Sequence, residues 1–202
     1  MTVLRLSDPQ ASRAVLIGVH DHTHPSDLPA IGAVERNLTG LADALVDPGI
    51  WGLPPEHLVQ VAQPLTDTDL LDHVMEVGPQ ATDTLLVYYA GHGLADTFSD
   101  ELYLALPASR TSRLDTAFRY EYLRRYLLSP AVKAKRVVVI LDCCYSARAL
   151  LAGVDVRHGA TCGPCCSTWA LCADCFSSDQ DRSGPGGGNL HRVYRSAPEA
   201  AD

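Results

Sequence analysis

Two short, dense apolar runs constrain the fold most, because each leads directly into a reactive side chain. Leu85–Tyr89 and Val137–Leu141 are rich in β-branched and aromatic residues, and both are short enough to be strands buried on two faces. The first run is followed by His92 and the second by Cys144, which lies 52 residues after the histidine. In open α/β sheets the ligand crevice lies at the carboxyl ends of the strands. The sequence therefore predicts that His92 and Cys144 face each other there.

Strand-like and helix-like segments alternate along the rest of the chain. Val34, Leu38, Leu41 and Leu45 follow helical spacing, and Thr66 is a predicted N-cap with Asp69 three residues later. The predicted strands are 14–20, 58–62, 85–89 and 137–141, with a hairpin arm at 102–106, and the predicted helices are 31–46, 66–77 and 119–128. This alternation predicts an α/β fold in which a mainly parallel sheet is covered by helices on both faces.

Several sequence blocks occur in the order found in one protein family. They are AVLIGVH, AVERNLTGLADAL, DTLLVYYAGHG, ELYLALPA and RVVVILDCCYSARAL. Over residues 14–151 the chain resembles the caspase-like cysteine peptidases (clan CD, peptidase C14), most closely the bacterial metacaspase-related proteins that include the effector-associated caspase-like clade. The resemblance implies a three-layer caspase-like sandwich. It divides the chain into an N-terminal extension (1–13), a p20-like catalytic domain (14–152) and a tail (153–202).

The resemblance also implies a catalytic dyad of His92 and Cys144. The thiolate is the nucleophile of such enzymes, and the histidine acts as base and later protonates the leaving amine. The backbone N–H groups of Gly93 and Cys144 are then expected to form the oxyanion hole. Alternation along a strand points Cys143 and Cys144 to opposite faces, so we expect only Cys144 to meet His92.

Asp142 is the candidate specificity residue. Metacaspases that cleave after arginine or lysine carry an aspartate at the matching position, and a buried carboxylate there would pair with a P1 guanidinium. The alternative is that Asp142 only caps a helix that begins near Cys144. The second acidic pocket residue of the family has no clear match, since Asn37 and Leu38 occupy that stretch.

The charge and hydropathy of the sequence argue against two classes of partner, nucleic acids and membranes. The formal net charge of −8 and the lack of a Lys/Arg run argue against nucleic acid. Residues 1–13 contain no apolar signal-peptide core, and no apolar stretch approaches 18 residues, so no membrane partner is expected. Protein or peptide substrates in the cytoplasm, where thiols stay reduced, are the expectation.

Two clusters raise the question of a metal. His20, His22 and His24 alternate in the loop after the first strand, but a solvated loop that lines the cleft is the preferred interpretation. In the tail, two C-x-x-C pairs could hold a zinc ion, although the gap between the pairs is short. These zinc candidates are Cys162, Cys165, Cys172 and Cys175. No cofactor is otherwise predicted, and calcium activation, which the sequence does not address, is left open.

The tail departs from the family. From about Gly153 apolar periodicity is lost, and a Gly-, Pro- and Ser-rich run follows at 183–188, which predicts disorder. The family continues after the nucleophile with strands that complete the sheet, and no such strand-like run is apparent here. We therefore expect the carboxyl-terminal part of the fold to be incomplete, or a partner to supply the missing wall.

Three functions follow from these observations. The first is a cysteine endopeptidase that uses His92 and Cys144 and cleaves after Arg or Lys. The second is an inactive or partner-completed caspase-like adaptor that binds an effector or adaptor protein in a bacterial signalling or conflict system. The third is a zinc-stabilised interaction protein in which the tail matters most.

Overall fold

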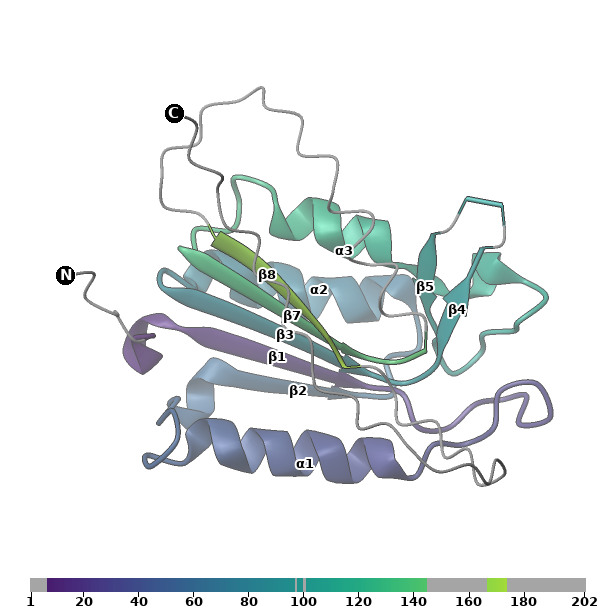
Figure 1. Cartoon of the computed structure of the whole chain (residues 1–202), viewed down its shortest axis with the longest axis horizontal. Coiled ribbons are helices and arrows are strands. Elements are labelled where there is room, and N and C mark those ends of the chain that lie inside the picture. Colours follow the sequence, from purple (N-terminus) through teal and green to yellow (C-terminus); the bar gives the residue numbers. More distant parts are fainter. Residues whose placement is uncertain (1–6, 97, 100, 145–166, 174–202) are drawn as a thin grey trace, which may run out of the picture.

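A five-stranded parallel sheet forms the centre of the protein. The computed structural model describes residues 7–96, 98–99, 101–144 and 167–173. The strands of this sheet lie in the order β2-β1-β3-β7-β8, with every neighbouring pair parallel (Figure 1). They are β1 (Arg13–Gly18), β2 (Leu58–Ala62), β3 (Thr84–Ala90), β7 (Arg136–Asp142) and β8 (Ser167–Ala173).

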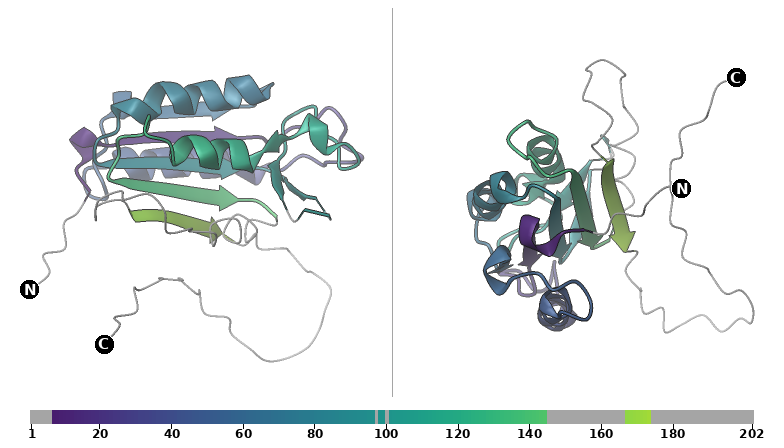
Figure 2. Two further views of the ribbon diagram at one scale, coloured as in Figure 1. Left: turned by 90° about the horizontal axis from the view of Figure 1, so that it is seen from above. Right: turned by 90° about the vertical axis from the view of Figure 1, so that its left-hand side faces the viewer.

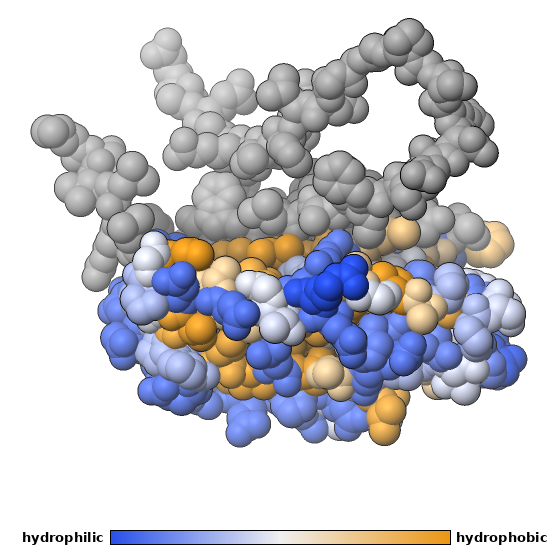
Figure 3. Space-filling view, turned by 90° about the horizontal axis from the view of Figure 1, so that it is seen from below, coloured by the Kyte–Doolittle hydropathy of each residue, from blue (hydrophilic) through white to orange (hydrophobic). Residues whose placement is uncertain are grey.

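Helices cover both faces of this sheet. One face carries α1 (Ala33–Val46), and the opposite face carries α2 (Asp67–Val77) and α3 (Tyr120–Leu127) (Figure 2). The predicted N-cap of α2 is present as a capping box, in which Thr66 accepts from the N–H of Asp69 and the Asp69 carboxylate accepts from the N–H of Thr66. Figure 3 shows the molecule from the α1 side, where hydrophilic side chains surround an apolar area.

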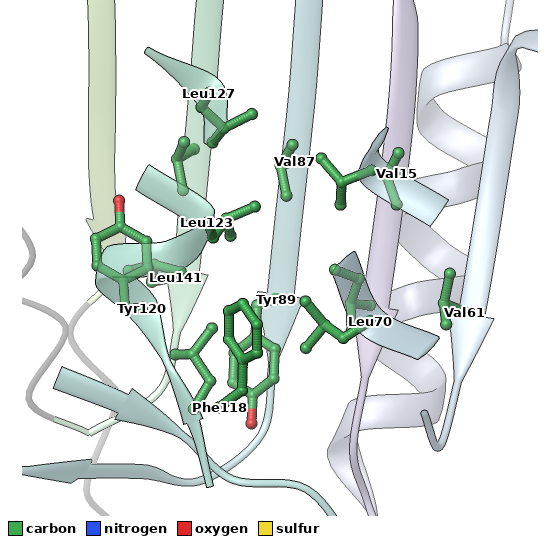
Figure 4. Packing of buried hydrophobic residues seen from close by; sticks show 14 of the residues in the cluster. Val15, Val61, Leu70, Val87, Tyr89, Phe118, Tyr120, Leu123, Leu127 and Leu141 are labelled. Atoms are coloured by element: carbon green, nitrogen blue, oxygen red, sulfur yellow. The ribbon is translucent and has the colours of Figure 1, made fainter. Parts of the chain in front are cut away.

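The helices on each face bury an apolar core against the sheet. Beneath α2 and α3, Leu70 and Leu123 meet Val15, Val87 and other side chains of the central strands (Figure 4). A smaller cluster under α1 includes Val34 and Leu38. β3 is buried along its whole length, because it receives side chains from both layers. This burial fixes the residues at its carboxyl end.

A second, three-stranded antiparallel sheet lies beyond the carboxyl ends of the central strands (Figure 1). It consists of β4 (Gly93–Ala95), β5 (Leu102–Leu104) and β6 (Phe118–Arg119). β4 starts three residues after β3 ends, so His92 lies in the turn between the two sheets.

The predicted fold class is confirmed, with one correction in the tail. β8 pairs with β7 over seven residues, although no strand was expected after Cys144. The segment STWALCA contains Cys172, one of the predicted zinc ligands, and its seven residues are also compatible with a strand. At the other end, residues 7–12 are attached to the domain, since Ser12 is fully buried and the N–H of Asp8 donates to Asp83. The tail for which disorder is predicted, 153–202, contains β8, and its other residues, 153–166 and 174–202, lie outside the described residues.

Candidate active site

The register of β3 and β7 brings the two predicted catalytic segments together. Ala90 pairs with Asp142, and the N–H of Gly91 donates to the carbonyl of Asp142 over 3.2 Å. His92 and Cys144 each follow two residues after this last pair. Both therefore lie at the carboxyl edge of the sheet, just beyond the ends of two neighbouring strands, as the sequence predicts.

Gly93 lies directly against the backbone of Cys144. A Cβ atom at position 93 would overlap the carbonyl oxygen of Cys144 and would lie 3.1 Å from the Sγ of Cys143. Only glycine allows this approach without movement of the backbone. The turn after β3 and the end of β7 are therefore in direct contact at the candidate site.

The imidazole of His92 is oriented by a backbone carbonyl. Its Nε2 lies 2.8 Å from the carbonyl oxygen of Pro29, and its own carbonyl accepts from the hydroxyl of Tyr89 over 3.1 Å. A carbonyl only accepts, so Nε2 carries the proton, and in the neutral ring Nδ1 is the basic atom. Burial is the main reason that the pKa of Tyr89 is raised well above its ordinary value, so this hydroxyl stays a donor.

The loop that carries Pro29 is held in place on the small sheet. Leu28 is buried with Leu94 and Ala105 of that region. Asp27 accepts hydrogen bonds from both the N–H and the hydroxyl of Thr111. Sequence patterns did not identify the role of Pro29, because it resides in a backbone carbonyl whose position depends on these distant contacts.

The two adjacent cysteines occupy different environments. Cys143 is 1% exposed and belongs to the core under α2 and α3, whereas Cys144 is exposed. This is the difference expected from strand alternation. Of these two residues, only Cys144 has a thiol that is open to a substrate.

Asp142 points towards α1, where two side chains hold its carboxylate. The amide of Asn37 donates to Oδ2 over 3.1 Å, and the hydroxyl of Tyr88 donates to the same atom over 3.0 Å. Asn37 thus stands beside Asp142 as a neutral hydrogen-bond donor. The residues of the predicted helix cap lie outside the described residues, so the capping alternative stays open.

The loop after β1 corrects one expectation. A solvated loop was expected, and Asp21 and Thr23 are exposed, but His22 is buried. The reason is that the loop folds over the small sheet: the N–H of Thr23 donates to Pro107, and Nδ1 of His22 lies 3.2 Å from the carbonyl of Leu106. The alternation of His20, His22 and His24 in the sequence does not indicate that His22 is the buried one.

The zinc candidates of the tail lie largely beyond the part of the chain that the structure describes. Cys162, Cys165 and Cys175 are outside it, and Cys172 is placed only through the backbone of β8. Within the described residues, no three His, Cys, Asp or Glu side chains are grouped so that they could hold a metal ion. Zinc in the tail stays a prediction. Among the same residues, no helix has the length and apolar character needed to cross a membrane.

Comparison with known proteins shows to which family the chain belongs. A family model described as the caspase domain matches residues 11–186, which include both strand ends of the site and β8. The chain belongs to the caspase domain family. No curated protein matches it. Caspase domain membership implies a cysteine peptidase, a hydrolase of peptide bonds with proteins as substrates.

Proposed function

We propose that this caspase domain protein is a cysteine endopeptidase in which Cys144 is the nucleophile and His92 the base. The observation that carries the proposal is the placement of an exposed thiol and an oriented imidazole at the ends of two paired strands. Gly93 connects them through its contact with the Cys144 backbone.

The contacts of His92 support a definite proton path. Because Nε2 donates to Pro29, Nδ1 takes the proton from the thiol of Cys144. The thiolate attacks the scissile carbonyl carbon, and the carbonyl electrons move onto oxygen. When this tetrahedral intermediate collapses, the C–N bond breaks and the amine takes the proton from Nδ1, which leaves a thioester on Cys144. Water, deprotonated by His92, then hydrolyses the thioester and restores the thiol.

The oxyanion of the intermediate needs nearby donors. We assign this role to the backbone N–H groups of Gly93 and Cys144, as the family resemblance implies. The close contact between these two residues supports the assignment, because it keeps both amides in one small region.

We further propose that the enzyme cleaves after arginine or lysine, as in the metacaspase-related branch of the family. Asp142 lies two residues before the nucleophile, and the two donors on its Oδ2 restrict the direction of the carboxylate. A carboxylate fixed in this way suits a planar guanidinium and repels an acidic P1 side chain. We also propose that the enzyme acts in the cytoplasm, where thiols stay reduced.

A panel of peptides that differ only in the P1 residue tests this function. The purified protein should release product from Arg and Lys peptides, more slowly from neutral ones, and not from Asp peptides. Absence of cleavage in the whole panel, with and without calcium, would refute the endopeptidase proposal. Efficient cleavage after Asp would retain the peptidase and refute the role of Asp142.

A further inference from the structure

A second histidine packs against His92 inside the folded loop after β1. The rings of His22 and His92 have centroids 5.1 Å apart, with their planes inclined by 49°. His22 is only 9% exposed. The reaction proposed above gives this imidazole no role, although it is the ring that contacts the base.

The hydrogen bonds of His22 define its neutral form. Nδ1 lies 3.2 Å from the carbonyl of Leu106, so Nδ1 carries the proton and Nε2 holds a lone pair. Nε2 is buried and has no hydrogen-bond partner among the described residues. A buried polar atom without a partner is costly, and in a native structure such an atom calls for an explanation.

Several charged or titratable groups act on His22. Burial and then a positive charge on His92 lower the pKa of His22, and His20 acts weakly in the same direction. The carbonyl of Leu106 and the carboxylate of Asp21 act in the opposite direction, but the net pKa of His22 is below its ordinary value. His22 is therefore neutral near pH 7. When His92 accepts the thiol proton, its neighbour is a neutral ring and not a second cation.

We propose that His22 is a positioning residue for the dyad, which holds the His92 ring against Pro29 and favours the imidazolium form that pairs with the Cys144 thiolate. The inference rests on the proposed dyad. The proton of the thiol moves from Sγ to Nδ1 of His92, and His22 neither gains nor loses a proton in the step. The buried lone pair of Nε2 supplies negative potential close to the new charge.

Alkylation of Cys144 by iodoacetamide measures thiolate formation without any substrate. The rate is followed by mass spectrometry of the Cys144 peptide across a range of pH, because the chain contains seven cysteines. His22→Phe keeps the ring volume and removes both nitrogens. We expect the pH midpoint to rise by about 0.5 to 1 unit, which lowers the rate below the midpoint by about 3- to 10-fold.

Two further variants separate positioning from packing. His22→Asn can still donate to Leu106 and offers an acceptor oxygen, so its midpoint should lie between those of the wild type and His22→Phe. His24→Phe, in the same loop, changes a histidine for which no contact with His92 is found in the described residues, and should leave the midpoint unchanged. If His22→Phe does not fold, the His22→Asn midpoint decides: an upward shift supports the inference, and the wild-type value overturns it.

A wild-type midpoint in folded His22→Phe, or an equal shift in His24→Phe, overturns the inference. These outcomes are distinct from failure of the proposed function. A chain that cleaves no peptide but shows the shift in His22→Phe would refute the peptidase and retain the role of His22. A chain that cleaves peptides but shows no midpoint shift in His22→Phe would support the peptidase and refute the role of His22.

Discussion

The Nε2 atom of His92 lies 2.8 Å from the carbonyl oxygen of Pro29. This contact determines which nitrogen of the imidazole carries the proton. A carbonyl oxygen can only accept a hydrogen bond, so Nε2 is protonated and Nδ1 is the nitrogen available as a base. Pro29 itself depends on the loop anchored by Leu28 and by the contact of Asp27 with Thr111. The orientation of the His92 ring, our proposed base, therefore relies on the small sheet, which lies outside the two strands that carry the proposed dyad.

The adjacent cysteines allow a matched test of the nucleophile. Cys144→Ala should lower peptidase activity by at least about 10³-fold, because it removes the attacking thiol. Cys143→Ala should retain activity within about threefold, since its buried thiol cannot reach a substrate, and should cost about 1 kcal/mol of stability. His92→Ala should resemble Cys144→Ala, and the double variant should be no worse, because the two residues act as a unit. Initial rates with an Arg peptide measure all four. Equal losses in Cys143→Ala and Cys144→Ala would refute the assignment.

Sequence reasoning succeeded where one local pattern determines the structure. The apolar runs of β3 and β7 predicted two parallel strands, and Thr66 with Asp69 predicted the start of α2. Burial on both faces holds for β3 along its whole length, whereas β7 is buried only at alternate residues. Sequence reasoning failed where the structure depends on contacts between distant segments. The burial of His22 results from a loop folding over Leu106 and Pro107, and Asn37 reaches Asp142 from a different helix. Neither relationship leaves a periodic signal in the sequence.

β8 was missed for a different reason. The cysteines around and within STWALCA suggested a metal motif, and a short parallel strand has no hairpin partner nearby to reveal it. Its place is determined by pairing with β7, from which it is separated by a long connection.

Gly93 provides a steric test of the site. Gly93→Ala should lower kcat by about 10²-fold, because its Cβ would displace the backbone of Cys144, and misplacement of reacting groups by about 1 Å has an effect of this size. Gly40→Ala is the matched control. A Cβ at this exposed position of α1 meets nothing within 4 Å, so the change should keep activity and raise stability by roughly 0.5–1 kcal/mol. Peptide cleavage and urea unfolding measure the two effects. A fully active Gly93→Ala would show that the turn tolerates displacement.

Asp83 is expected to make stability depend on pH. Burial alone would raise the pKa of Asp83, but hydrogen bonds from the N–H of Asp8 and from Arg136, with the charge of Arg136, outweigh burial and hold the pKa below its ordinary value. A depressed folded-state pKa gives stability that is present above the unfolded-state value of about 4 and is lost as the pH falls through the folded-state value. Asp83→Asn should therefore lower the free energy of unfolding by about 2 kcal/mol at pH 7. The difference from the wild type should shrink towards pH 2.

A matched control for Asp83 is Asp115, whose ion pair with Arg113 is exposed. Asp115→Asn should change stability little at any pH, because solvent weakens such pairs. Urea unfolding at pH 7, 4 and 2 measures both variants. The same difference between Asp83→Asn and the wild type at every pH would show that the ionised carboxylate contributes nothing.

Asp142→Asn tests the preference for basic P1 residues. It removes the charge but keeps the size of the side chain, so kcat/KM for an Arg peptide should fall by about 10- to 100-fold, while a neutral P1 peptide should change little. Asn37→Ala removes one donor to Oδ2 and keeps the carboxylate, so it should give a smaller loss with the same peptide.

The helix-cap alternative predicts a different outcome for the same variants. Asparagine caps a helix about as well as aspartate, so Asp142→Asn would then leave both stability and the P1 preference unchanged, whereas Asp142→Ala would lower stability. The ratio of kcat/KM for Arg and neutral peptides, measured beside urea unfolding, separates the two roles. A ratio that falls in Asp142→Asn, and falls less in Asn37→Ala, would assign Asp142 to substrate recognition, because only a pocket carboxylate connects these two changes to the charge of P1.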